Sequence, residues 1–271
     1  DLDGSLLDHH TYSAALAQPQ LRRLAQLGVP VIPTSSKTRA EIEVLMAELE
    51  LAAPFISENG AAVYIPEGYF PQQPADTQIR DGYWVHAGSP PRADWLQLLA
   101  QLGGRYAGQF RSFDAAGVEG VMTMTGLDES GAWRANQREY SEPLQWLGDD
   151  TTLQTFVAEL QAHGATVARG GRFLSVSGDC SKGRALVWLS ETDRQAWPEY
   201  PLHELAVGDS GNDVPMLEAA QTALLVRSPV HDFPVLARTG GVHRSSDYGP
   251  AGWAQGVASW LDTFLELEQK N

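Results

Sequence analysis

The stretch Leu205-Ala206-Val207-Gly208-Asp209-Ser210-Gly211-Asn212-Asp213 decides the expected fold of this chain. A short apolar run ends in a Gly-Asp turn, and a helix is predicted to begin after Gly211. Asp209 lies at the strand tip and Asp213 in the first turn of that helix. Ligands of open α/β sheets bind at this edge, and carboxylate oxygens there suit Mg²⁺. The alternative is an ordinary strand-turn-helix junction, in which Gly, Asp and Asn serve only turn geometry and capping.

A second acidic pair opens the chain, in Asp1-Leu2-Asp3-Gly4-Ser5. Two acids two positions apart at the end of a strand point the same way. One carboxylate can attack phosphorus as a nucleophile. The other can give a proton to the leaving oxygen and later take one from water. Asp-x-Asp alone also fits an acidic loop at a frayed terminus, but that interpretation leaves the matching stretch around Asp209 unexplained.

Composition limits the possible partners. The chain has 271 residues, of which 43% are hydrophobic, and a formal net charge of −15. Such acidity argues against nucleic acid or an anionic membrane as a partner. A small anionic substrate would then need local positive charge, which Mg²⁺ and a few placed Lys and Arg side chains can supply. The single cysteine excludes an internal disulfide, and no apolar stretch is long enough to span a membrane. A cytoplasmic monomer or homodimer is expected.

Two segments between the acidic motifs carry further candidates. Residues 29–33 are apolar and predict a short strand that delivers Ser35 to the start of the next helix, where its hydroxyl can hold a phosphate oxygen. Helix capping is compatible with this, with Thr38 and Glu41 as a capping box. Residues 54–64 predict a hairpin around the turn Glu58-Asn59-Gly60.

Residues 83–172 mix strands and helices without a regular βα rhythm, which predicts a separate α+β domain inserted into the first. The core is then formed by residues 1–82 and 173–271. Arginine binds carboxylate and phosphate bidentately, so four arginines near two turns of the insert are candidates for holding an anionic substrate. Surface salt bridges are the alternative for each of them. These residues are Arg134, Arg138, Arg169 and Arg172.

Lys182 follows the insert, at a predicted helix N-terminus. The helix dipole disfavours a cation there, and a bound phosphate would offset this. A solvated Lys182 paired with Asp179 is the alternative.

The order of these motifs resembles that of the haloacid-dehalogenase (HAD) superfamily of aspartate-nucleophile phosphatases. The motifs are Asp1-x-Asp3, Ser35, Lys182 and Gly208-Asp209-x-x-Asn212-Asp213. The insert resembles the C2-type cap of subclass IIB phosphatases. In this superfamily a buried apolar strand precedes the first Asp, so such a strand is expected ahead of Asp1.

The resemblance narrows to the mannosyl-3-phosphoglycerate phosphatase family. It covers nearly the whole chain and is densest in the core. It rests on Asp8-His9-His10-Thr11-Tyr12, Thr34-Ser35-Ser36-Lys37-Thr38-Arg39-Ala40-Glu41, Ser57-Glu58-Asn59-Gly60-Ala61-Ala62, Arg138-x-x-Ser141-Glu142-Pro143, Gly170-Gly171-Arg172-Phe173 and Gly249-Pro250-x-Gly252-Trp253. Ser5 stands where Thr is commoner, and both residues provide a hydroxyl.

The resemblance implies an α/β fold: a Rossmann-like HAD core with a mostly parallel sheet and an inserted α+β C2-type cap. It also implies a Mg²⁺-dependent phosphatase that removes phosphate from mannosyl-3-phosphoglycerate, a small anionic sugar phosphate, to give mannosylglycerate. The implied reaction passes through an aspartyl-phosphate, with Asp1 as nucleophile and Asp3 as acid and base. The implied ligands of Mg²⁺ are Asp1, the Asp3 carbonyl and Asp209, with Asp213 in support. The implied phosphate-binding residues are Ser35, Lys182 and Asn212. The implied contacts to the rest of the substrate are Ser36, Lys37, Glu58, Asn59, Arg138, Ser141, Glu142 and Arg172.

Three other functions fit the same motifs. One is a broader sugar-phosphate phosphatase that acts on glucosyl-3-phosphoglycerate or a hexose phosphate. Another is a phosphomutase, which returns the phosphoryl group instead of releasing it. The third is a non-catalytic protein that binds Mg²⁺ or a phospho-ligand, although the intact set of acids, Ser35 and Lys182 argues against it.

Overall fold

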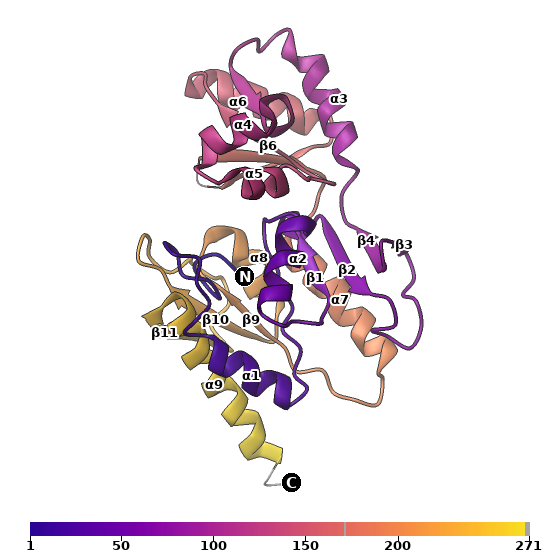
Figure 1. The fold of residues 1–271 in the computed structure, drawn as a ribbon, viewed down its shortest axis with the longest axis vertical. Coiled ribbons are helices and arrows are strands. Elements are labelled where there is room, and N and C mark those ends of the chain that lie inside the picture. Colours follow the sequence, from indigo (N-terminus) through magenta and orange to yellow (C-terminus); the bar gives the residue numbers. More distant parts are fainter. Residues whose placement is uncertain (171, 269–271) are drawn as a thin grey trace.

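The computed structural model describes residues 1–170 and 172–268, which form two parts (Figure 1). The lower part in that view contains both labelled chain ends and carries a parallel and an antiparallel sheet. The upper part is formed by the middle of the chain and has an antiparallel sheet of its own. We call these parts the core and the cap. Within the described ranges, no helix is long and apolar enough to cross a membrane.

In the parallel sheet of the core, one strand ends immediately before Asp209. Its strands and the helices that cover it are β9 (Leu205–Gly208), β10 (Thr222–Arg227), β11 (Val242–Tyr248), α1 (Gln18–Gln26), α7 (Lys182–Ala196), α8 (Val214–Ala219) and α9 (Gly249–Glu268). The strand order is β11-β10-β9. Alternate residues of β9 face opposite sides, as strand geometry requires. Val207 packs in one cluster with α1 and α9, and Ala206 packs in another with α8. Burial on both sides explains why β9 and β10 are apolar runs.

The antiparallel sheet of the core contains the predicted hairpin. Its elements are β1 (Phe55–Ser57), η1 (Glu58–Gly60), β2 (Ala62–Pro66), β3 (Gln78–Arg80), β4 (Tyr83–Ala87) and the adjoining helix α2 (Arg39–Glu48). The strand order is β1-β2-β4-β3. β1 and β2 pair with Ser57 opposite Ala62, and the turn between them is a short 3₁₀ helix. The hairpin prediction is confirmed.

Residues 29–33 do not form the predicted strand. The segment is held beside β1 by two backbone hydrogen bonds, from Ile56 N to Pro33 O at 2.8 Å and from Ser35 N to Ile56 O at 3.0 Å. Pro30 and Pro33 have no N–H group, so a continuous ladder cannot form along this segment. The strand prediction was therefore wrong, but the segment still carries Ser35 to the end of β1.

The cap is a four-stranded antiparallel sheet with helices packed against it. Its elements are α3 (Arg92–Gly103), β5 (Phe110–Ser112), α4 (Phe113–Thr125), α5 (Glu129–Ala135), β6 (Glu142–Trp146), α6 (Asp150–Ala162), β7 (Thr166–Gly170) and β8 (Phe173–Ser177). The strand order is β5-β6-β8-β7. Trp95, Phe156 and Leu174 belong to its central apolar cluster. Gly171, which lies between the candidate arginines Arg169 and Arg172, is outside the described residues.

Strand pairing divides the chain at different points from the predicted bounds 83–172. β4 pairs with β2, so residues 83–87 belong to the core sheet, and β8 pairs with β6 and β7, so residues 173–177 belong to the cap sheet. The two connections between the parts touch each other, because Gly178 N donates to Ser89 Oγ at 2.8 Å. Which sheet a strand belongs to depends on the strand with which it pairs. That pairing is set by the tertiary structure, and the order of strands and helices along the sequence does not specify it.

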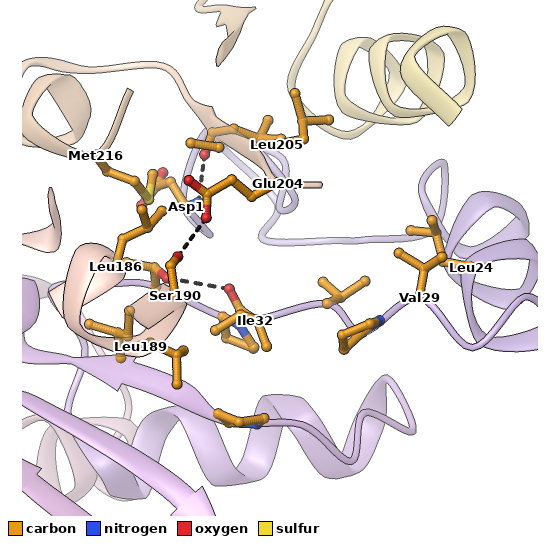
Figure 2. Close-up of a pocket in the computed structure, with 18 of the residues that line it drawn as sticks. Asp1, Leu24, Val29, Ile32, Leu186, Leu189, Ser190, Glu204, Leu205 and Met216 are labelled. Atoms are coloured by element: carbon orange, nitrogen blue, oxygen red, sulfur yellow. Dashed lines mark hydrogen bonds between the residues drawn. The ribbon is translucent and has the colours of Figure 1, made fainter. Parts of the chain in front are cut away.

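An apolar cavity of about 250 Å³ lies in the core beside Asp1 (Figure 2). β9 lines one side and residues 29–33 line another, with Val257 and Trp260 of α9 also contributing. The Asp1 nitrogen lies 2.7 Å from Val207 O, so the chain reaches the site alongside β9. The strand expected ahead of Asp1 lies outside the described residues.

Gly60 provides a test of how closely the core elements pack. Its φ is +94°, and a Cβ on it would lie 2.2 Å from Ser181 O at the start of α7. Gly28 has a similar φ of +69° but nothing within 4 Å of the corresponding position. Both alanine variants suffer left-handed strain of about 1–2 kcal/mol. Gly60→Ala should also suffer a backbone clash, so we expect it to be less stable than Gly28→Ala by at least about 2 kcal/mol in urea unfolding. Equal losses in the two variants would contradict this packing.

Candidate active site

The loop after β9 is held by the carboxylate of Asp213. Its Oδ2 accepts hydrogen bonds from Asp209 N and Ser210 N, both at 3.1 Å. Asp213 is fully buried, in the short 3₁₀ turn η2 (Gly211–Asp213) ahead of α8. Gly208 makes this possible, since a Cβ there would lie 2.5 Å from Asp213 Cβ. The predicted strand tip with two acids is therefore formed, and Asp213 also fixes the loop that carries Asp209.

Lys182 connects the first and last motifs. Its Nζ donates to Asp1 Oδ1 and to Asp213 Oδ1, both at 2.6 Å, and the side chain is fully buried. Two carboxylates thus offset the unfavourable position of a cation at the start of α7. α7 approaches α8 closely because Gly183 has no side chain: a Cβ there would lie 2.2 Å from Pro215 O. The alternative pairing of Lys182 with Asp179 was wrong.

Burial and charge act in opposite directions on the two acids of the β9 loop. Burial disfavours ionisation of Asp213, but the adjacent Lys182 ammonium outweighs this and holds the pKa of Asp213 below its usual value. Burial, reinforced by the charge of Asp213, raises the pKa of Asp209. Asp209 Oδ2 lies 3.3 Å from His231 Nε2, whereas its Oδ1 is buried without a hydrogen-bond partner among the described residues.

The acidic residues form a group that suits a divalent cation. Asp1, Asp209 and Asp213 each offer a carboxylate oxygen, and these oxygens lie within 4.8 Å of one another. Gly4 brings the first motif against Asp209, since a Cβ at Gly4 would lie 2.5 Å from Asp209 Oδ2. Asp209 Oδ1 is buried and has no hydrogen-bond partner in the described part of the chain, so it is an atom that a cation would satisfy. The side chain of Asp3 lies outside this group of three.

Asp3 is instead held by Lys37. Lys37 Nζ donates to Asp3 Oδ2 at 2.7 Å, while Asp3 Oδ1 is buried without a hydrogen-bond partner among the described residues. Burial disfavours the charge of Lys37, but Asp3 and Glu41 outweigh this and raise the pKa of Lys37. The ammonium group of Lys37, a predicted substrate contact, therefore orients the second acid of the first motif.

Ser35 and Ser36 lie at the entrance to α2. Ser35 is buried, and its Oγ accepts a hydrogen bond from Lys37 N at 3.2 Å. The predicted capping box is present: Thr38 Oγ1 accepts from Glu41 N at 3.2 Å, and Glu41 Oε2 accepts from Thr38 N at 2.9 Å. The carbonyl of Ser36 faces the cap, where Arg138 Nη1 donates to it at 2.8 Å.

The turn between β1 and β2 contacts both the cap and the β9 loop. Glu58 and Asn59 have positive φ, and the Glu58 carboxylate accepts hydrogen bonds from Glu139 N at 2.9 Å and Ser141 Oγ at 2.5 Å. Asn59 Oδ1 accepts from Asn212 Nδ2 at 3.1 Å. Glu58 and Ser141, both predicted substrate contacts, are paired with each other, so the Glu58 carboxylate binds the cap.

Glu142 and Arg172 do not join the rest of the predicted site. Glu142 is fully buried in the cap, where it accepts hydrogen bonds from Arg92 Nε at 2.5 Å and Asp114 N at 2.9 Å. Burial raises the pKa of Glu142, and Arg92 opposes that rise. Arg172 is exposed and donates to Thr125 O at 3.3 Å, also within the cap.

Comparison with known proteins identifies the family. Residues 1–77 match the family described as haloacid dehalogenase-like hydrolase. The chain is 35% identical over 257 residues to a glucosyl-3-phosphoglycerate/mannosyl-3-phosphoglycerate phosphatase of Methanococcoides burtonii, covering 95% of this chain and 94% of that one. This chain belongs to the haloacid dehalogenase-like hydrolases. A phosphatase of the same name from Persephonella marina is 29% identical over 258 residues, again with 95% and 94% coverage. The crystal structure of Thermoplasma acidophilum 0175 has the same fold, with a TM-score of 0.65, 16% identity and 96% and 95% coverage.

Membership of the haloacid dehalogenase-like hydrolases confirms the expected α/β core with an inserted α+β cap, and the chain is a phosphoric monoester hydrolase. Hydrolases of this family generally use a divalent metal, and the acidic group described above provides donors for one. The contact of His231 with Asp209 was not predicted. His231 follows β10, and no spacing or motif in the sequence connects it with the β9 loop.

Replacing Lys182 by Met should destabilise the fold strongly at neutral pH. The change leaves buried carboxylates without their cation, and we expect a loss of about 3–5 kcal/mol at pH 7 in urea unfolding with EDTA present. Because the pKa of Asp213 is lowered, its stabilising contribution is complete above the ordinary value and is lost as pH falls through the lowered one. The deficit of the variant should therefore shrink in acid.

The matched control for this prediction is Arg184→Met. Arg184 pairs with Asp179 at an exposed position near the same end of α7, and its loss should leave the unfolding midpoint nearly unchanged. If Lys182→Met were no less stable than this control, the buried ion pairs would not be a major support of the core.

Proposed function

We propose that this chain is a Mg²⁺-dependent phosphatase that releases phosphate from mannosyl-3-phosphoglycerate and leaves mannosylglycerate. The main support is the separation of the two acids of the first motif. Asp1 shares Lys182 with Asp213 beside Asp209, whereas Asp3 is oriented by Lys37. Two carboxylates with different partners can take different roles in one reaction.

In this mechanism, an Asp1 carboxylate oxygen attacks phosphorus in line, and the bond to the leaving glycerate oxygen breaks. An aspartyl-phosphate forms on Asp1. Oδ1 of Asp3, which has no hydrogen-bond partner among the described residues, delivers a proton to the leaving oxygen. The same atom then takes a proton from the water that attacks the aspartyl-phosphate, which regenerates Asp1 and releases phosphate.

The remaining groups stabilise charge on the phosphoryl oxygens. Ser35 Oγ and Lys182 Nζ would bind these oxygens, with Asn212 beside them. Asp1, the Asp3 carbonyl, Asp209 and Asp213 would hold Mg²⁺, which supplies positive charge next to the transferring group when bound. The same local positive charge would offset the net charge of −15 of the chain as an anionic substrate approaches.

The contacts made by cap residues reduce the number of residues that we propose to bind the substrate. Arg138 reaches Ser36 at the core–cap boundary, so its guanidinium remains the cap group we propose for the glycerate carboxylate. Glu142 and Arg172 make their contacts inside the cap, and we do not retain them as substrate contacts. The second candidate substrate is glucosyl-3-phosphoglycerate, because both relatives carry it in their names.

Phosphate release tests the function directly. Mannosyl-3-phosphoglycerate, glucosyl-3-phosphoglycerate and mannose 6-phosphate should be compared with Mg²⁺ and with EDTA. We expect metal-dependent release from the first compound and little from mannose 6-phosphate, which has no glycerate carboxylate. Equal rates of phosphate release from all three compounds would contradict the proposed substrate specificity but would still be consistent with a phosphatase. Return of the phosphoryl group to the product would indicate a phosphomutase.

Asp1→Asn tests the nucleophile. The substitution keeps the shape of the side chain, and we expect kcat to fall by at least roughly a thousandfold while circular dichroism reports an intact fold. The matched control is Asp179→Asn, an exposed acid whose partner is Arg184, and its activity should equal that of the original protein. Full activity of Asp1→Asn would exclude an aspartyl-phosphate on this residue.

A further inference from the structure

Tyr12 is an exposed aromatic residue beside the candidate active site. Its relative exposure is 58%, and its φ is +56°. Left-handed backbone is unusual for a bulky side chain and persists only where the surroundings hold it.

The loop that carries Tyr12 is fixed by Asp8. The carboxylate of Asp8 accepts hydrogen bonds from His10 N at 3.1 Å and from Thr11 N at 2.8 Å. Asp8 also closes the loop through its backbone, donating to Ser13 O at 3.0 Å and accepting from Tyr12 N at 3.0 Å. These bonds explain how the strained conformation is maintained while the ring stays in solvent.

The ring lies next to the pair formed by Lys37 and Asp3. Lys37 Nζ is 5.5 Å from the centre of the Tyr12 ring and 2.7 Å from Asp3 Oδ2. In the proposed reaction Asp3 protonates the leaving oxygen, so the leaving group must be close to Asp3. Lys37 thus connects the Tyr12 ring with the acid that the leaving group approaches in the proposed reaction.

We propose that Tyr12 forms one wall of the leaving-group subsite and packs its aromatic face against the pyranose ring of the substrate. This inference rests on the proposed function and adds a specificity-determining residue to it. One face of a pyranose ring presents C–H groups with partial positive charge, which suits the negative face of an aromatic ring. A ring fixed in advance by the Asp8 loop also loses little freedom on binding.

Binding without turnover gives the first test. Mannosyl-3-phosphoglycerate and 3-phosphoglycerate should be titrated by calorimetry, with Mg²⁺, into Asp1→Asn and into Asp1→Asn variants that also carry Tyr12→Ala or Tyr12→Phe. We expect Tyr12→Ala to weaken binding of the mannosyl compound roughly tenfold, which is the contribution expected of one aromatic contact. Binding of 3-phosphoglycerate, which has no sugar, should be the same in all three proteins. The variant with Tyr12→Phe should bind both compounds as tightly as Asp1→Asn alone.

Steady-state kinetics of the single variants give the second test. Tyr12→Ala should raise KM for the mannosyl substrate with little change in kcat. Tyr200→Ala is the matched control, because Tyr200 is 72% exposed and lies in the connection between α7 and β9. Its kinetics should equal those of the original protein. A fall in kcat of Tyr12→Ala for the mannosyl substrate would show that the ring acts through Lys37 and Asp3, and would overturn the proposal. Equal losses in Tyr12→Ala and Tyr12→Phe would assign the effect to the hydroxyl and overturn it as well.

The two proposals fail in different ways. If the original protein releases phosphate from the mannosyl substrate but Tyr12→Ala binds it unchanged, only the role of Tyr12 is overturned. If the mannosyl compound binds in a Tyr12-dependent way and is not hydrolysed, only the proposed reaction is overturned. If it binds no more tightly than 3-phosphoglycerate and is not hydrolysed, both are overturned.

Discussion

The buried ammonium group of Lys182 is the interaction on which the site depends. It lies 2.6 Å from carboxylate oxygens of Asp1 and Asp213, which are far apart in the sequence. Each of these groups would be costly to bury alone. Together they satisfy one another, and the remaining oxygen of Asp213 fixes the backbone of the β9 loop. A single cation therefore sets the geometry of the proposed nucleophile and that of the β9 loop, which carries the proposed metal ligands.

This arrangement requires backbones to approach more closely than side chains allow. Gly4, Gly60, Gly183 and Gly208 each lie where a Cβ would come within 2.5 Å or less of another atom. Three of these contacts bring together segments that are distant in the sequence, and the fourth closes the β9 loop on itself. The glycines are thus part of the site although none carries a functional group.

Polar contacts around Glu139, Tyr140 and Ser141 join the cap to the core, where the Tyr140 ring also packs in the apolar cluster with Phe55 and Tyr64. Glu58 accepts hydrogen bonds from all three residues, and Glu139 also pairs with Arg39 and Arg80 of the core. Polar groups can exchange partners with water at lower cost than an apolar interface can be exposed. In the proposed reaction, these polar contacts would allow the cap to open for substrate and to close before the chemical step.

The sequence by itself determined the acids, their order and several local structures. The Asp1 and Asp209 motifs, the hairpin around Glu58 and the capping box at Thr38 depend on residues close together in the chain, and local geometry follows from such spacing. The strand at residues 29–33 was wrongly predicted because apolar character was counted and the missing N–H groups of two prolines were not. The irregular order of strands and helices predicted the inserted α+β domain. The family resemblance identified that domain as a C2-type cap and added the proposed roles of the acids.

Only the tertiary structure decided which partner each polar side chain takes. Lys37 turns to Asp3, Glu58 to the cap, Glu142 to Arg92 and His231 to Asp209. Strand pairing likewise assigned β4 to the core and β8 to the cap. These partners are far apart in the sequence. Leaving a buried charge unpaired costs free energy, so the stable fold is one in which each such charge has a partner. That choice depends on the packed arrangement of all the elements, which no local pattern contains.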